Sequence, residues 1–248
     1  MQMEAMMHTA FYVRPIMKVV GIIACICLAS ACGAPSSNAS KSEPQADGAS
    51  SSRSTGGNDG VTSAAPGQKL AGNMNDYIDQ LLTWASKDEK PILERAKKNG
   101  GLSASDYEKA WSDYKSCMVS RGYKPFELIK WPNGVYEMPS HMVGTQKQEE
   151  KYAEDYHECY GKKIMAIDTL YTAQVGNPSL YADQTEGVAD CLKRSGAVSM
   201  DFSISTFKSE IGSGKYSQFD IQDPKVRACF AANDWHMGLQ SDPYAQLW

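Results

Sequence analysis

The sequence lacks most of the signatures that identify an enzyme or a metal site. Only four of its 248 residues are histidine, and it has no H-E-x-x-H, G-x-S-x-G or dinucleotide-binding motif. Residues 212–215 read Gly-Ser-Gly-Lys, like the end of a phosphate-binding loop, but Ser209 and Tyr216 replace two residues that the motif requires. We therefore interpret this segment as a polar turn, and we expect no cofactor.

The sequence also lacks any block of positive charge. Its 25 Lys and Arg residues are mixed with 29 Asp and Glu residues, which gives a net charge of -4. A surface that binds nucleic acid needs a basic patch or stripe. This distribution argues against a nucleic acid as a partner.

The one long apolar run covers residues 19–31. Its 13 residues are too few for a helix that spans a bilayer, which needs about 20 residues. Arg14 and Lys18 precede the run, and small residues end it. A basic start, an apolar centre and small residues at the cut are typical of a secretory signal peptide. We expect residues 1–31 to be this signal, with residues 1–16 an artefact of start-site choice.

The end of the run, Ala29-Ser30-Ala31-Cys32, resembles the lipobox of bacterial lipoproteins, although Ala29 stands where that motif usually has Leu. The resemblance implies that Cys32 carries a diacylglyceryl group, becomes the mature N-terminus and anchors the protein to the cell membrane, facing outside the cytoplasm. Two acyl chains give durable attachment where one is marginal. Two alternatives stay open: a competing lipobox at Cys25, and a simple secretory signal that leaves a soluble protein.

Residues 32–67 contain the lipidated cysteine and a connecting segment rich in Ser, Gly and Pro. From Gly33 to Gly67 there are nine serines, and Val61 is the one aliphatic residue beyond alanine. Such a segment cannot bury enough apolar surface to offset the entropy of ordering it. We expect a disordered tether with a relaxed span of about 30 Å.

Residues 68–248 have the apolar spacing of helices and form one domain. Residues 74–85 follow the i, i+3, i+4 pattern, and shorter helices are expected from Pro91 to Gly100 and over residues 205–211. Further helix starts are predicted from capping residues: Ser105 with Glu108, Thr145 with Gln148 for a long helix through Ile167, Asn177 with Pro178, and Asp223 with Pro224. We predict a mainly α fold, a single helical bundle braced by disulfides. Residues 126–138, around Asn133-Gly134, form either a short β-hairpin or an extended loop.

Four cysteines remain in the domain once the signal and Cys32 are set aside. They are Cys117, Cys159, Cys191 and Cys229. An even number in an exported domain favours two disulfides. The sequence allows three connectivities, and we choose Cys117–Cys159 and Cys191–Cys229 because each pair then joins successive predicted helices. The cysteines are too far apart in sequence for the paired spacing of a zinc site, so we expect no metal.

Three of these cysteines share one local layout. An apolar residue follows the cysteine, and a turn residue comes five places after it; the turn residues are Gly122, Gly196 and Asp234. This layout is typical of a helix end that a disulfide holds and a left-handed residue caps. Similar cysteine-then-glycine helix ends occur in uncharacterised surface lipoproteins of Gram-positive bacteria, particularly actinobacteria, a resemblance that implies no activity.

Aromatic residues are the compositional clue to binding. Tryptophan and tyrosine supply stacking surfaces for sugars or flat contact surfaces for proteins. The candidates are Trp131, Trp235 and Trp248. We expect Trp131 and Trp248 to be exposed, because one lies beside a turn and the other at the end of the chain. Tyr152, Tyr156 and Tyr160 recur every four residues, which favours the interior of a helix.

Two features leave a catalytic interpretation open. His141 lies in a loop, where it acts in catalysis only if the fold brings a carboxylate to it. Acidic residues crowd the helix that starts at Thr145: Glu149, Glu150, Glu154, Asp155 and Glu158. On an amphipathic helix such residues usually form the solvated face, paired with nearby lysines. His157 fits a polar surface position.

These observations favour a lipid-anchored cell-surface protein with a non-catalytic binding domain. Its expected partners are the membrane, through Cys32, and an envelope protein or glycan. The alternative is a cell-envelope hydrolase or processing enzyme with an unfamiliar site. A transporter-linked solute receptor ranks last, because about 180 residues with little strand signal do not make two α/β lobes.

Overall fold

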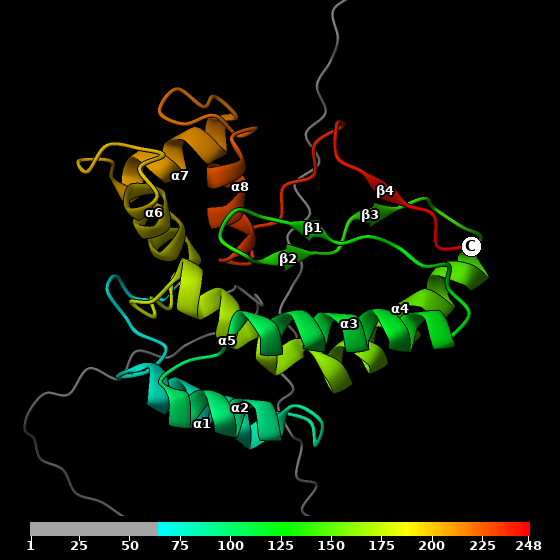
Figure 1. Ribbon diagram of the computed structural model, residues 1–248. Helices are drawn as coiled ribbons and strands as arrows, with labels where there is room; N and C mark the ends of the chain where they lie inside the picture. Colours follow the sequence, from blue (N-terminus) through cyan, green and yellow to red (C-terminus); the bar gives the residue numbers. More distant parts are fainter. Residues whose placement is uncertain (1–63) are drawn as a thin grey trace, which may run out of the picture. The chain divides into compact units, whose positions relative to one another are not determined.

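The computed structural model describes residues 64–248, so the predicted signal peptide, Cys32 and residues 33–63 lie outside it. In chain order the elements are α1 (Met74–Trp84), α2 (Lys90–Asn99), α3 (Ala104–Ser120), β1 (Ile129–Lys130), β2 (Tyr136–Glu137), β3 (Ser140–His141), α4 (Gln146–Lys163), α5 (Met165–Gly176), α6 (Gln184–Arg194), α7 (Ile204–Ser213), α8 (Pro224–Ala231) and β4 (Tyr244–Ala245) (Figure 1). The prediction of a mainly α fold is confirmed. In this range no helix is both long and apolar enough to cross a bilayer.

Side-chain caps fix most helix starts. The capping box of Thr145 and Gln148 is present, with each side chain bonded to the other residue's backbone N–H. Asp223 caps α8 as predicted, and Pro224 is its first residue. The predicted box of Ser105 and Glu108 is wrong by two residues: Ser103 is the cap, and its Oγ accepts a hydrogen bond from the Asp106 N–H.

The long helix predicted through Ile167 is broken at Ile164. The break creates a new helix start in the core, and no side chain of Ile164 can cap it. Glu89 supplies the missing acceptor from the turn before α2, with its Oε1 2.7 Å from the Ala166 amide nitrogen. The Glu89 side chain is fully buried, and burial raises its pKa even though the Ser86 and Ala166 amides bind it.

The helix predicted to start at Asn177-Pro178 is also wrong. Asn177 instead ends α5, and its side chain bonds the Tyr181 N–H and C=O in a tight turn. The next helix, α6, starts later and is capped by Asp183. Asparagine is favoured both at helix N-caps and in turns where its side chain binds the following backbone. The residue type alone therefore does not distinguish the turn at Asn177 from a helix start.

Residues 64–248 contain four short strands in two pairs. Of the two alternatives for residues 126–138, the hairpin is the one present: β1 and β2 are antiparallel, with Ile129 opposite Glu137. No sequence pattern predicted the second pair, in which β3 and β4 run parallel with Ser140 opposite Tyr244. That pairing brings the C-terminal residues beside the middle of the chain.

Buried apolar side chains form two clusters. The first core is built from α1 to α5 and the hairpin, together with alanines of α8 and Leu247 near the C-terminus. The second core is built from α6, α7 and α8 with the loops that join them. Helix α5 contacts α1, α3 and α4 in the first core and α6 and α8 beside the second (Figure 1). At this junction a Cβ on Gly176 would lie 2.3 Å from the Cβ of Ala232, so only glycine fits.

Each core has one disulfide. Cys117–Cys159 joins α3 to α4, and Cys191–Cys229 joins α6 to α8. Both disulfides and their predicted pairing are confirmed in the structure. Each tethers two helices that already pack against each other.

The shared layout after three cysteines has one backbone geometry. The turn residues Gly122, Gly196 and Asp234 have φ of 100°, 71° and 55°. In each case the next residue's N–H bonds the carbonyl of the residue that follows the cysteine: Tyr123 to Met118, Ala197 to Leu192, and Trp235 to Phe230. The prediction of left-handed helix ends is confirmed.

Candidate functional site

Trp131, which we expected at the surface, is buried. Its side chain is 8% exposed, because the hairpin folds onto the helices and Asn133 donates a hydrogen bond to the Ala228 carbonyl of α8. The Trp131 Nε1–H donates to Glu137 Oε2 at 2.8 Å, and the Arg227 guanidinium lies 4.5 Å from the ring centroid. A ring covered in this way offers no open face for a ligand.

Trp235 and Trp248 are half-buried. The Trp235 ring packs edge-on against Phe207 of the second core, at 5.4 Å between centroids. The Trp248 ring packs edge-on against His141 at 5.3 Å and leaves no room for a side chain at Gly144. Both rings hold the fold together, and their role in recognition stays a prediction.

A half-buried carboxylate among tyrosines lies against the first core. Asp168 of α5 accepts hydrogen bonds from the Tyr107 hydroxyl of α3 at 2.6 Å and the Tyr160 hydroxyl of α4 at 2.7 Å. The Tyr107 oxygen also accepts the Tyr136 N–H of the hairpin, and its ring stacks on Tyr171. One acidic residue therefore connects three helices and the hairpin.

Burial changes the acidity of this cluster. It raises the pKa of Asp168 to about 6, against the effect of the two tyrosine hydroxyls. The charge of Asp234 raises the same pKa further, and His236 lowers it. Burial and the nearby Asp168 charge also raise the pKa of Tyr107 and Tyr160, so both keep their protons. The pKa of the Asp168 carboxyl group therefore lies well above its ordinary value of 3.8.

His141 does meet a carboxylate. Its Nε2 lies 2.9 Å from Glu149 Oε2, and its ring packs on Tyr152. The Gly144 N–H donates to the other oxygen of Glu149; this bond, followed by that of His141, lowers the pKa of Glu149. Within residues 64–248 no Ser, Thr or Cys side chain hydrogen-bonds to His141, so the pair has no adjacent nucleophile.

The acidic residues of α4 do not all lie on a solvated face. Asp155 is buried and accepts hydrogen bonds from the Tyr123 hydroxyl, the Arg121 guanidinium and the Lys151 ammonium. Burial would raise its pKa, but Lys151, Tyr123 and Arg121 outweigh it and hold the pKa below its ordinary value. This carboxylate joins the end of α3 to α4 close to the Cys117–Cys159 disulfide. His157 is exposed, as predicted.

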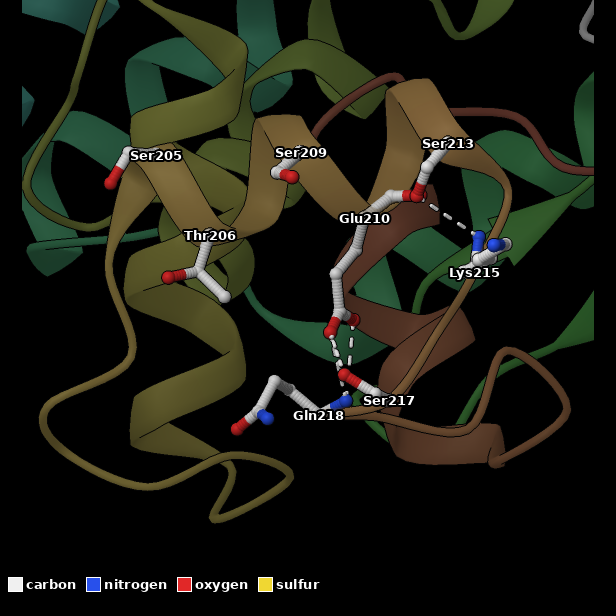
Figure 2. Close-up of a pocket in the computed structure, with 8 residues that line it drawn as sticks. All are labelled: Ser205, Thr206, Ser209, Glu210, Ser213, Lys215, Ser217 and Gln218. Atoms are coloured by element: carbon white, nitrogen blue, oxygen red, sulfur yellow. Dashed lines mark hydrogen bonds between the residues drawn. The ribbon is translucent and has the colours of Figure 1, made fainter.

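An open hollow of about 510 Å³ lies beside α7, and Figure 2 shows the residues that line it. Its wall is mostly hydroxyl groups, but Glu210 reaches across it to bind the Ser217 hydroxyl and the Gln218 N–H. Gly214 ends α7 in the left-handed conformation, and the Lys215 N–H bonds Ser213. The Gly-Ser-Gly-Lys segment therefore spans the C-terminus of α7, where carbonyl groups repel phosphate, and the polar turn begins at Gly214.

In the part of the chain that the structure describes, no group of three or more His, Cys, Asp and Glu residues is placed to hold a metal ion. Comparison with known protein families, curated proteins and solved structures finds no match to this chain. The chemistry must therefore be inferred from the residues alone.

Sequence reasoning missed the carboxylates that lie within the fold and hydrogen-bond to distant parts of the chain. Glu89 and Glu186 bind backbone amides of distant segments, Ala166 and Gly67. Asp168 had one visible signal: it is a lone acid in the apolar stretch Met165–Tyr171. Its partners are far apart in sequence, so only the fold identifies them.

Proposed function

We propose that this protein is a lipid-anchored extracytoplasmic binding protein. Residues 1–31 act as its export signal, Cys32 carries the lipid, and residues 33–67 connect the lipid to the helical domain. The partner of the domain is an envelope protein or glycan. The proposal extends the lipobox resemblance with what residues 64–248 contribute.

The pairing of cysteines carries this proposal. All four cysteines of the described range are in disulfides that join packed helices. Disulfides of this structural kind persist in oxidising compartments and are rare in the cytosol. Export is the event that gives a bacterial chain such an environment, and the apolar run before Cys32 is the segment suited to direct it.

The distribution of acidic groups supports binding over catalysis. Catalytic acids and bases are positioned to face a substrate, whereas Glu89, Glu186 and Glu210 face backbone amides of their own chain. Asp155 and Asp168 face tyrosine hydroxyls. These side chains are committed to the fold.

The His141–Glu149 pair is the observation on which the alternative, an envelope hydrolase, would rest. Turnover of a cell-wall or glycan substrate that is abolished by His141→Ala would favour that alternative. Turnover unaffected by His141→Ala would leave the pair as a structural support for the β3–β4 ribbon.

Mass spectrometry of the protein from its native membranes tests the anchor. We expect a mature N-terminus at residue 32 with a diacylglyceryl thioether, and we expect Cys32→Ser to lose it. Cys25→Ser is the matched control, since it changes the competing site and should leave acylation intact. Acylation at Cys25, or an unmodified Cys32 in the native protein, would contradict the proposal.

A further inference from the structure

Three exposed apolar residues lie on or just after the paired strands β3 and β4. Val143 is 84% exposed, Tyr244 55% and Met142 54%. Ser140 pairs with Tyr244, and Met142 is two residues after Ser140, so Tyr244 and Met142 project from the same face. His141 and Ala245 project from the opposite face, toward the first core. We call Met142, Val143 and Tyr244 the apolar tip.

The backbone under the tip is held in place. The Met142 N–H bonds the Ala245 carbonyl, and the Gly144 N–H bonds Glu149 at 2.7 Å. The Trp248 ring fills the space against Gly144. A loop fixed by these contacts presents its apolar side chains to solvent in a set geometry, which is the preorganisation that a contact surface requires.

The size of the tip decides between possible occupants. Its three residues are far fewer than the roughly 20–30 that each partner contributes to a standard protein complex, where each buries about 800 Å². A bilayer needs less from such a tip, because a tether raises the effective concentration of the surface. Thirty-one residues, 33–63, separate Cys32 from the first described residue.

We propose that Met142, Val143 and Tyr244 insert into the outer face of the membrane that holds the lipid anchor. The inference rests on the anchor proposed above, which supplies the tether. Valine and methionine enter the acyl boundary, and tyrosine suits the headgroup level because it has an apolar ring and a polar hydroxyl. The contact gives the tethered domain a defined orientation relative to the membrane.

Photocrosslinking of the full chain in its native membranes tests the tip. A photoreactive phenylalanine analogue replaces Val143 in one variant and Met200 in the matched control, since Met200 is 77% exposed and belongs to the loop before α7. We expect phospholipid adducts at position 143 at least about fivefold more often than at position 200. Equal adducts at the two positions, or protein adducts in place of lipid at position 143, would overturn the inference.

A second arm separates the tip from the anchor. If Cys32 is acylated but position 143 yields no excess of lipid adducts, the tip is wrong and the anchor stands. The mature chain from residue 32 is also coupled through its Cys32 thiol to a maleimide lipid in vesicles of phosphatidylglycerol and phosphatidylcholine, since the other four cysteines are in disulfides. This supplies the tether without native acylation. Lipid photoadducts at position 143 in excess of those at position 200 support the tip whatever the native state of Cys32, and equal adducts overturn it.

Discussion

The two cores are packed from different kinds of side chain. The first core is rich in tyrosine, and its hydroxyl groups converge on two carboxylates: Tyr107 and Tyr160 on the half-buried Asp168, and Tyr123 on the buried Asp155. The second core is rich in phenylalanine, and Phe207 contacts Phe219 and Phe230 through ring edges and faces. Both have one disulfide and the same left-handed helix end.

The difference concerns how each core specifies its structure. Hydrogen bonds to a carboxylate are directional, so they fix the relative positions of α3, α4 and α5. Phenylalanine rings have preferred contact geometries but no hydrogen-bonding group, so they restrain the positions of their helices less. We therefore expect the second core to depend more on its disulfide than the first core does.

Removal of the disulfides one at a time is the largest test of this comparison. The closed loops span 42 and 38 residues, so the chain-entropy model gives nearly the same loss for both, about 4 kcal/mol. We expect Cys191→Ala with Cys229→Ala to open the second core to hydrogen exchange while the first stays protected. Cys117→Ala with Cys159→Ala should lower the unfolding midpoint and leave both cores protected below it.

Hydrogen exchange read by mass spectrometry, with urea unfolding alongside, separates these outcomes. If loss of the Cys117–Cys159 bridge exposes the first core just as readily, then the tyrosine–carboxylate network adds no specification beyond ordinary packing.

Asp168 gives the first core a pH dependence of its own. Its folded pKa of about 6 lies above its ordinary value of 3.8, so folding favours the protonated form. The group's contribution to stability therefore rises as pH falls through 6 and levels off below about 4. Relative to Asp168→Asn, the wild-type chain should gain about 1–3 kcal/mol of unfolding free energy between pH 7 and pH 4.

Urea unfolding of both chains at a series of pH values measures this gain. Tyr160→Phe is the companion variant: it removes a hydroxyl that lowers the pKa of Asp168, so the midpoint of the pH dependence should move upward. A difference between wild type and Asp168→Asn that stays constant with pH would contradict the assignment.

Features of the fold that depend on nearby residues were predictable from the sequence, whereas features that depend on residues far apart in the chain were not. The caps at Thr145 and Asp223 and the left-handed Gly122 and Gly196 need only nearby residues, and all four were predicted. The break at Ile164 needed Glu89, which binds Ala166 from 77 positions away. No local sequence pattern indicates a contact between residues so far apart in the chain. The apolar spacing of α4 alone predicts that the helix continues past Ile164.

Trp131 shows the same limit at the candidate site. Its place beside an Asn-Gly turn predicted exposure, because turns usually lie at the surface. The hairpin instead packs against α8, whose Arg227 covers the ring. The cysteine pairing was predicted because four cysteines leave only three choices, whereas each aromatic ring has many neighbours available to it.

The smallest expected effect on stability comes from substitutions at the left-handed helix ends. Gly196 has φ of 71° with open space around its Cβ position, so Gly196→Ala should cost about 1 kcal/mol through backbone strain alone. Asp234 holds the equivalent position with φ of 55° and adds a charge that raises the pKa of Asp168. Asp234→Asn keeps a side chain that tolerates this conformation and removes the charge.

Asp234→Asn should therefore leave the helix end intact and move the Asp168 pH dependence to lower pH. The helix end is followed by exchange protection of the Trp235 amide, which bonds the Phe230 carbonyl. A full loss of that protection would show that the Asp234 side chain itself holds the turn. An unchanged pH profile would show that the two carboxyl groups do not interact, and that the cores are electrostatically separate as well as differently packed.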